Sequence, residues 1–334
     1  MTAGRLLAVW GAGAGAASIA AVAAFWISRH ARANDARLWH GVWSSIAVAS
    51  LAAPAAALIS PLWQIVVLIG PADPLSPDAG VWLTRLAAAA SGAAVIAVAG
   101  TLGLLARLIW GCHGALRLAR EGRPLGADQL ARVDSLVPGL GGRCRLHAQL
   151  RVPVAIGWRR GVVLLPVSAD RWPDDRLRAI LLHEQRHILR QDFLWNFVAA
   201  AQHAVYWWNP FAWMIARRVR LTAELASDRD AASTGAASYA RHLVETSQEL
   251  AHLTAPYRVL APSAVSDLEQ RINALLNDGH AGAVSGRRLR FVMLSVAAAV
   301  VITPMLVQAR VSRHPLPEAH ADAHAARHAQ RHNH

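Results

Sequence analysis

The chain has 334 residues, 54% of them hydrophobic and 16% charged, and its 34 basic and 21 acidic side chains give a formal charge of +13. This hydrophobic content excludes a disordered chain, and the two cysteines, Cys112 and Cys144, exclude a disulfide scaffold or a cysteine-rich zinc fold. Because the apolar residues are gathered in blocks, the composition also argues against an ordinary soluble enzyme.

Four of these blocks are long and apolar enough to form membrane-spanning helices. A helix needs roughly 20 apolar residues to cross the hydrocarbon core of a bilayer. The candidate spans cover residues 6–28, 41–70, 81–110 and 287–309. The first is expected to be a retained span and not a signal peptide, because two further spans follow it closely. The second contains Pro54 and Pro61, which predict a kink or a strong tilt.

The distribution of arginine in the short loops predicts the orientation of the chain. The loop 29–40 is mainly basic, the loop 71–80 carries only acidic charges, and arginines gather again at 287–290, just before the last span. Basic loops remain in the cytoplasm. We therefore expect a multi-pass protein of the bacterial inner (cytoplasmic) membrane, with residues 112–286 cytoplasmic and both termini outside. On this interpretation much of the basic excess is a topology signal, and no direct contact with nucleic acid is predicted.

The segment between the third and fourth spans is long enough for one globular domain. Two extended runs within 151–167 flank a turn at 158–161 and predict a β-hairpin. Helical patterns follow, and Asn209 with Pro210 has the residue types of an N-cap and a first helical position. Helices are expected over residues 173–192, 193–208, 210–234 and 266–277. The predicted fold class is thus mainly α, with residues 1–111 forming three spans and an α+β domain inserted before the fourth.

Residues 183–187 in the first of these helices read H-E-Q-R-H, an H-E-x-x-H pattern. Two histidines four residues apart lie on one face of a helix, so the imidazoles of His183 and His187 can bind the same zinc ion. Glu184 lies beside them and can take a proton from zinc-bound water. Apolar neighbours predict that the motif is buried, where unpaired polar groups would be costly. This argues against an exposed polar face.

A catalytic zinc ion needs a third protein ligand and an open position for water. Glu224 and Asp228 are again spaced i and i+4, on the third predicted helix of the inserted domain. One carboxylate can bind the metal while the other accepts the free N–H of a ligating histidine. The alternative is a pair of surface charges, and the apolar pattern of the folded-back helix favours the ligand role. His203 is a third candidate, although a histidine on an apolar helix is more often a packed residue.

Several motifs in this order resemble one family of membrane peptidases. HEQRHILRQD, followed by VYWWNPFAW and AELASD, is similar to the M56 metallopeptidases, the family of the BlaR/MecR antibiotic-sensing antirepressors. VPVAIGWRRGVVLLP before the motif and LEQRINALL after it extend the resemblance over residues 1–309. The resemblance implies a zincin-like domain of gluzincin type with one zinc ion on His183, His187 and Glu224. It further implies that Glu184 is the general base and that Asp228 supports a ligating histidine.

The same resemblance implies a substrate-binding mode. An edge strand of the hairpin would hold an extended peptide by β-augmentation, using Val154, Ala155, Ile156 and Gly157. By family analogy the substrate is a cytoplasmic protein, such as a winged-helix repressor, and self-cleavage in the linker 277–290 is an activation step. The other expected partner is the lipid bilayer.

The chain departs from the antibiotic sensors after the fourth span. Those proteins carry an external penicillin-binding domain with a Ser-x-x-Lys motif, whereas this sequence contains no lysine, so β-lactam sensing is not expected. Residues 310–334 form a histidine-rich tail that is predicted to lie outside. On a helix, His320, His324, His328 and His332 would form one stripe able to bind metal. A biased, disordered tail that binds metal only incidentally is the other interpretation.

Two further functions remain open from the sequence. The first is a membrane receptor without proteolytic activity, which would have a structural metal site and a metal-sensing tail. Glu184 argues against it, because a structural site has no need of a base. The second is a quality-control membrane protease resembling the M48 family, which shares the H-E-x-x-H pattern. Three predicted spans before the inserted domain and one after it, together with the Asn209-Pro210 motif, favour the M56 family over the M48 family.

Overall fold

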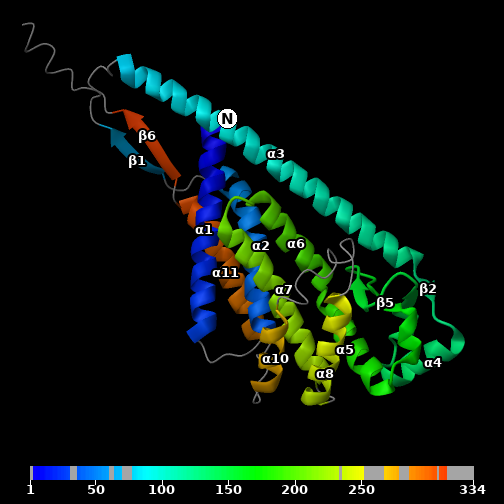
Figure 1. Ribbon diagram of the computed structural model, residues 1–334. Helices are drawn as coiled ribbons and strands as arrows, with labels where there is room; N and C mark the ends of the chain where they lie inside the picture. Colours follow the sequence, from blue (N-terminus) through cyan, green and yellow to red (C-terminus); the bar gives the residue numbers. More distant parts are fainter. Residues whose placement is uncertain are drawn as a thin grey trace, which may run out of the picture.

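Four long helices dominate the computed structural model (Figure 1). The structure describes residues 3–30, 36–59, 64–69, 77–232, 235–251, 267–277, 286–306 and 308–313. The long helices coincide broadly with the four apolar blocks of the sequence: they are α1 (Ala3–His30), α2 (Ala36–Ile59), α3 (Pro77–Glu121) and α11 (Gly286–Leu306). α1, α2 and α11 pack together, and α3 runs obliquely past them on its way to the sheet.

Within the described part of the chain, one helical stretch meets the length and hydropathy required of a membrane span. It is Gly92–Glu121 of α3, and none of its most apolar window is buried. Gly13–Ser28 and Phe291–Ile302 are shorter apolar stretches of α1 and α11. An exposed apolar surface of this size marks an interaction site, with a membrane or with another protein.

The second apolar block differs from the span predicted over residues 41–70. α2 starts earlier and ends at Ile59, and Gln64–Ile69 form strand β1, which pairs in parallel with β6 (Gln308–Arg313). Four of the six residues in β1 are β-branched and favour extended backbone. The prolines that the sequence places at 61 and 71 disfavour a helix that continues through this segment. β6 likewise takes residues that were predicted to end the fourth span.

A four-stranded sheet lies at the end of α3. Its strand order is β2 (Arg123–Pro124), β3 (Cys144–His147), β5 (Val162–Pro166), β4 (Val154–Ile156), with β3 parallel and β4 antiparallel to β5. The predicted hairpin over 151–167 is thus present as β4 and β5, with Ala155 opposite Val163. Helix α4 (Ala127–Leu136) and two 3-10 turns (Gly141–Arg143 and Val167–Arg171) complete this part.

Among the described residues, five helices lie between the sheet and α11: α5 (Asp174–Arg190), α6 (Asp192–Val205), α7 (Pro210–Ala231), α8 (Ala236–Ala251) and α10 (Leu268–Asn277). Gln191 separates α5 from α6 with a left-handed backbone (φ 58°), one residue before the predicted boundary. Asn209 caps α7 as predicted, because its side chain accepts a hydrogen bond from the Phe211 N–H at 3.0 Å.

The helices of the apolar blocks and the segment inserted between α3 and α11 do not form two separate bodies. α6 and α7 pack between the long helices, in a core that includes Ala17 and Ala21 of α1, Trp43 and Ile46 of α2, and Ile215 of α7. A second core joins α4 and α5 to the sheet through Val163, Leu165 and Leu181. The first core shows that part of the segment 112–286 shares its interior with α1 and α2. The tail histidines at 320, 324, 328 and 332 lie outside the described residues.

Candidate metal centre

Helix α5 carries the H-E-x-x-H motif and buries it. Asp174 and Asp175 lie in its first turn, where negative charge favours the helix N-terminus. Leu177 and Leu181 on the inner face pack into the sheet core. His183 and Glu184 lie on the same inner side and are each 9% exposed, so the motif is a buried polar patch on an amphipathic helix.

Three ligand atoms converge at this patch. The Nε2 atoms of His183 and His187 are 3.0 Å apart, and the Glu224 carboxylate of α7 lies 3.6 Å from the first and 3.7 Å from the second. Donors bound to one tetrahedral zinc ion at about 2.0–2.2 Å are roughly 3.4 Å apart. The separations are close to this value, and by geometry and donor type the three residues form a candidate metal-binding group.

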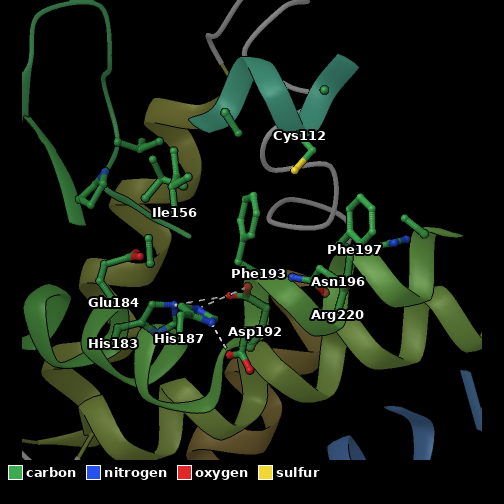
Figure 2. Close-up of a pocket in the computed structure, with 18 of the residues that line it drawn as sticks. Cys112, Ile156, His183, Glu184, His187, Asp192, Phe193, Asn196, Phe197 and Arg220 are labelled. Carbon is green, nitrogen blue, oxygen red and sulfur yellow. Dashed lines mark hydrogen bonds and ion pairs between the residues drawn. The ribbon is translucent and has the colours of Figure 1, made fainter. Parts of the chain in front are cut away.

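Each histidine is held at its other ring nitrogen. His187 Nδ1 lies 2.6 Å from Asp192 Oδ2 (Figure 2). His183 Nδ1 lies 2.9 Å from the Tyr239 hydroxyl and 3.2 Å from Asp228 Oδ1. Acceptors at Nδ1 fix the tautomer that leaves the Nε2 lone pair for a metal. The ligand atoms are therefore oriented toward one another before any ion binds.

Arg271 of α10 supplies positive charge to the carboxylates. It donates to both oxygens of Asp228, at 2.7 and 2.6 Å, and lies 3.1 Å from Glu224 Oε2. Burial disfavours charged carboxylates, but this guanidinium and His183 outweigh it. They lower the pKa of Asp228 to about 2 and hold the pKa of Glu224 well below its usual range. Both groups are ionised at neutral pH, as a ligand and a hydrogen-bond acceptor need to be.

The same carboxylates determine the charge of His183. Burial alone would lower its pKa, but the hydrogen bonds and charges of Asp228 and Glu224 outweigh this and raise the pKa to about 9. Burial raises the pKa of Tyr239 well above its ordinary value, so its hydroxyl stays neutral and donates to Asp228 at 2.7 Å. Without a metal, His183 is therefore protonated at neutral pH, and its positive charge faces the carboxylates of Asp228 and Glu224.

A second network connects Asp192 to the long helices. Arg190 donates to Asp192 Oδ2 at 2.6 Å and also to the Ala223 carbonyl and the Ser227 hydroxyl of α7. His40 of α2 lies with its Nε2 3.5 Å from Asp192 Oδ1. The acceptor of a candidate metal ligand is thus in contact with a helix of the apolar bundle.

The metal-binding group opens into a cleft of about 580 Å³ between β4, α3 and α6 (Figure 2). Glu184 lines this cleft together with both histidines and Glu224. β4 is the edge strand of its sheet, and Val154, Ala155 and Ile156 lie along the cleft wall. Across from them are apolar side chains such as Phe193. The edge strand and the candidate metal-binding group thus face the same cleft.

The structure brings together most of the residues that the sequence singled out. His183, His187 and Glu224 converge, Asp228 contacts His183, and Glu184 faces the same cleft. Gly157 does not line the cleft; with φ 104° it forms the turn after β4, where an added Cβ would lie 3.2 Å from the Gly161 Cα. His203 lines the cleft on α6 and is outside the metal-binding group.

Three supporting residues were not assigned any role from the sequence: Asp192, Tyr239 and Arg271. Asp192 lies just after the helix that carries the H-E-x-x-H motif, five residues from His187. A carboxylate so close in sequence could have been predicted as the partner of that histidine. Arg271 lies in the LEQRINALL motif, where one arginine on a short amphipathic helix indicates a buried partner. Tyr239 carried no signal, since α8 as a whole was not expected.

Comparison with known proteins shows the family to which the chain belongs. The family model described as BlaR1 peptidase M56 matches residues 87–275, more than half of the chain. The Regulatory protein BlaR1 of Bacillus licheniformis is 29% identical over 79 residues, which are 24% of this chain. The aligned stretch covers only 13% of that relative's own length. The matched range contains α5, α7, α8 and most of α10, and the chain belongs to the M56 family of peptidases.

Proposed function

We propose that this protein is an integral-membrane zinc endopeptidase that transmits a signal by cutting a cytoplasmic protein. The observation that carries the proposal is the convergence of His183, His187 and Glu224 at a cleft that Glu184 and an edge strand also line. A structural zinc site is normally closed by four protein ligands. Here three protein donors converge at an open cleft, as a hydrolytic site requires.

The residues have distinct roles in peptide hydrolysis. Zinc bound by the three ligands would lower the pKa of water and polarise the peptide carbonyl. Glu184 takes the proton from the attacking water and returns it to the leaving amine nitrogen. Asp192, Asp228 and Tyr239 keep the two imidazoles in the ligating orientation.

β4 supports an extended peptide substrate. Its outer edge has no strand partner among the described residues, and its residues lie along the cleft wall. A peptide that adds to this edge would be aligned by main-chain hydrogen bonds, with side chains alternating between cleft and solvent. The scissile bond of such a strand would pass beside the metal position.

The arrangement of the elements supports an external N-terminus and a cytoplasmic site. The start of α1 and the β1–β6 pair lie at one end of the bundle, whereas α5, α8 and α10 lie toward the other (Figure 1). This agrees with the alternation of basic and acidic loops in the sequence. By analogy with the regulatory relative, a transcriptional repressor is the proposed substrate, and the linker 277–290 is the proposed self-cleavage site.

Replacing the proposed base tests the function directly. Glu184→Ala is expected to abolish proteolysis in cells while the purified protein keeps its zinc, because Glu184 is not a ligand. Peptides that accumulate with the wild-type protein and are missing with Glu184→Ala, compared by mass spectrometry, would identify substrate and cleavage site together. Cleavage that persists in the variant would refute the mechanism.

A further inference from the structure

The hairpin formed by α6 and α7 carries no formal charge around its tip. From Phe193 to Ala216 the sequence contains no arginine, aspartate or glutamate. α6 has 14 residues and is about 21 Å long, too short to cross a hydrocarbon core of roughly 30 Å. Asn209 and Pro210 then reverse the chain, and α7 runs back toward the metal centre.

The tip of this hairpin is bound to three of the long helices. The Tyr206 hydroxyl donates to the Ser50 carbonyl of α2 at 2.8 Å. Asn209 Nδ2 donates to the Ser18 hydroxyl of α1 at 2.9 Å, and Trp207 Nε1 donates to the Ala97 carbonyl of α3 at 3.4 Å. Trp10 of α1 packs edge-on against Trp208, with ring centroids 5.9 Å apart.

These contacts give the depth of the tip in the bundle. Ser18 lies near the middle of the 28-residue α1, and Ser50 lies in the middle part of the 24-residue α2. At 1.5 Å per residue, both are about 14–23 Å from either end of their helices. If α1 and α2 cross the bilayer, the tip of the hairpin lies close to its midplane.

The tip also meets the condition for irregular backbone inside a membrane. Non-helical backbone at that depth is tolerated only where protein satisfies its polar groups. Asn209 both caps α7 and bonds to α1, and the Trp207 carbonyl accepts from Trp213 Nε1 at 2.8 Å. The large side chains left exposed are tryptophans, Trp208 and Trp213, which are 46% and 58% exposed.

We infer that α6 and α7 form a re-entrant hairpin that enters the bilayer from the side of the metal centre, turns at mid-depth and exposes its tip to lipid hydrocarbon. The hairpin's length then places the metal centre about 21 Å from the midplane, in the headgroup layer. The cleft, which Leu104 and Leu108 of α3 and Ala200 of α6 line, extends from there toward the hydrocarbon. Peptide segments lying at the membrane surface are the substrates that this position favours.

The inference rests on the proposed membrane placement of α1 and α2, and cysteine accessibility separates the two claims. Single cysteines replace Trp213, Ile19 in the middle of α1, and Val167 beside the sheet, in full-length protein with Cys112→Ala and Cys144→Ala. Ile19 is 70% exposed and Val167 56%, so both match Trp213 in exposure. A membrane-impermeant maleimide is added to open membrane fragments, which expose both bilayer surfaces.

The expected result is rapid labelling of Val167→Cys. Labelling of Trp213→Cys and Ile19→Cys should be at least tenfold slower, until a denaturing detergent dissolves the membrane and unfolds the protein. Equal, fast labelling of Trp213→Cys and Val167→Cys with Ile19→Cys protected overturns the hairpin inference and leaves the membrane placement standing. Fast labelling of Ile19→Cys overturns both.

Trp208→Cys repeats the labelling measurement at a second exposed position of the tip and leaves the bond between Trp213 and the Trp207 carbonyl intact. A nitroxide at position 208 should show high collision rates with oxygen and low rates with a polar nickel chelate; the reverse order would contradict the inference.

Discussion

Arg271 offers no ligand atom, yet it balances the charge of the two carboxylates beside the metal position. It is 4% exposed, and it is hydrogen-bonded to Asp228, which is 1% exposed. A buried pair is a weak source of net stability, but removing one partner leaves an uncompensated buried charge. Loss of Arg271 would therefore destabilise the protein mainly because Asp228 would remain buried, charged and unpaired.

Arg271→Leu is expected to lower the free energy of unfolding by about 3–5 kcal/mol, because Asp228 would remain buried and unpaired. Arg117→Leu is the control, since the Arg117–Glu121 pair on α3 is exposed and pairs of this kind contribute about 0.3–0.5 kcal/mol. Chemical denaturation in detergent measures both. If Arg271→Leu were as stable as Arg117→Leu, Arg271 would not be compensating a buried charge on Asp228.

The raised pKa of His183 predicts how metal affinity depends on pH. The ligating form is neutral imidazole, and in the metal-free protein the His183 pKa is about 9. Metal must therefore displace one proton below this pH. The zinc dissociation constant should rise about tenfold for each pH unit between 8 and 6, as one displaced proton requires. Competition with a chromophoric chelator measures this slope. A dissociation constant that does not change over this range would contradict the proton-for-metal exchange.

Contiguous motifs made the candidate ligands and Asp228 predictable, whereas Asp192, Tyr239 and Arg271 were not predicted. His183, Glu184 and His187 share one helical turn, and Glu224 and Asp228 share another, so helical periodicity alone placed each set on one face. Tyr239 and Arg271 reach the site from α8 and α10. No spacing rule connects those helices to α5, because their positions depend on tertiary packing.

At the scale of elements, local signals were reliable where a turn or cap defined the boundary. The β4–β5 hairpin and the Asn209 cap were predicted from residue types, and both are present. The second apolar block shows where such reasoning stops. Hydropathy marks Gln64–Ile69 as lipid-compatible, but it does not distinguish a helix from a strand whose partner lies more than 200 residues away.

Asn209 joins a local signal to a tertiary contact, and the two contributions can be separated. Ser18→Ala removes the bond from Asn209 to the Ser18 hydroxyl, leaves the 3.4 Å bond from Asn209 Nδ2 to the Ala14 carbonyl, and is expected to cost about 1 kcal/mol of unfolding free energy. Asn209→Ala removes both bonds and the cap, so about 2 kcal/mol is expected. The double variant should cost less than the sum of the two single variants, because both single changes delete the Asn209–Ser18 bond. Equal losses for the two single variants would show that the cap and the bond to Ala14 contribute nothing.

At the scale of the whole molecule, the sequence predicted a membrane part and a separate domain, and the structure connects them. α6 and α7 carry one edge of the cleft and pack into the bundle at the same time. His40 of α2 lies beside Asp192, which orients His187. Composition could not predict this, because a charge-free amphipathic hairpin has the same pattern in a domain core as in a membrane. These contacts connect α2 to the candidate ligand His187 through a single side chain, Asp192.

The proposed activity requires that His183, His187 and Glu224 together hold one zinc ion, with Glu184 acting beside it. The most direct test is the zinc-to-protein ratio of the purified protein, with the tail histidines replaced by alanine so that they contribute no sites. Wild-type protein and Glu184→Gln should each carry about one zinc ion per chain, whereas Glu224→Gln should lose it during dialysis, since one of three protein ligands is weakened. Zinc content that is unchanged in Glu224→Gln would contradict the account.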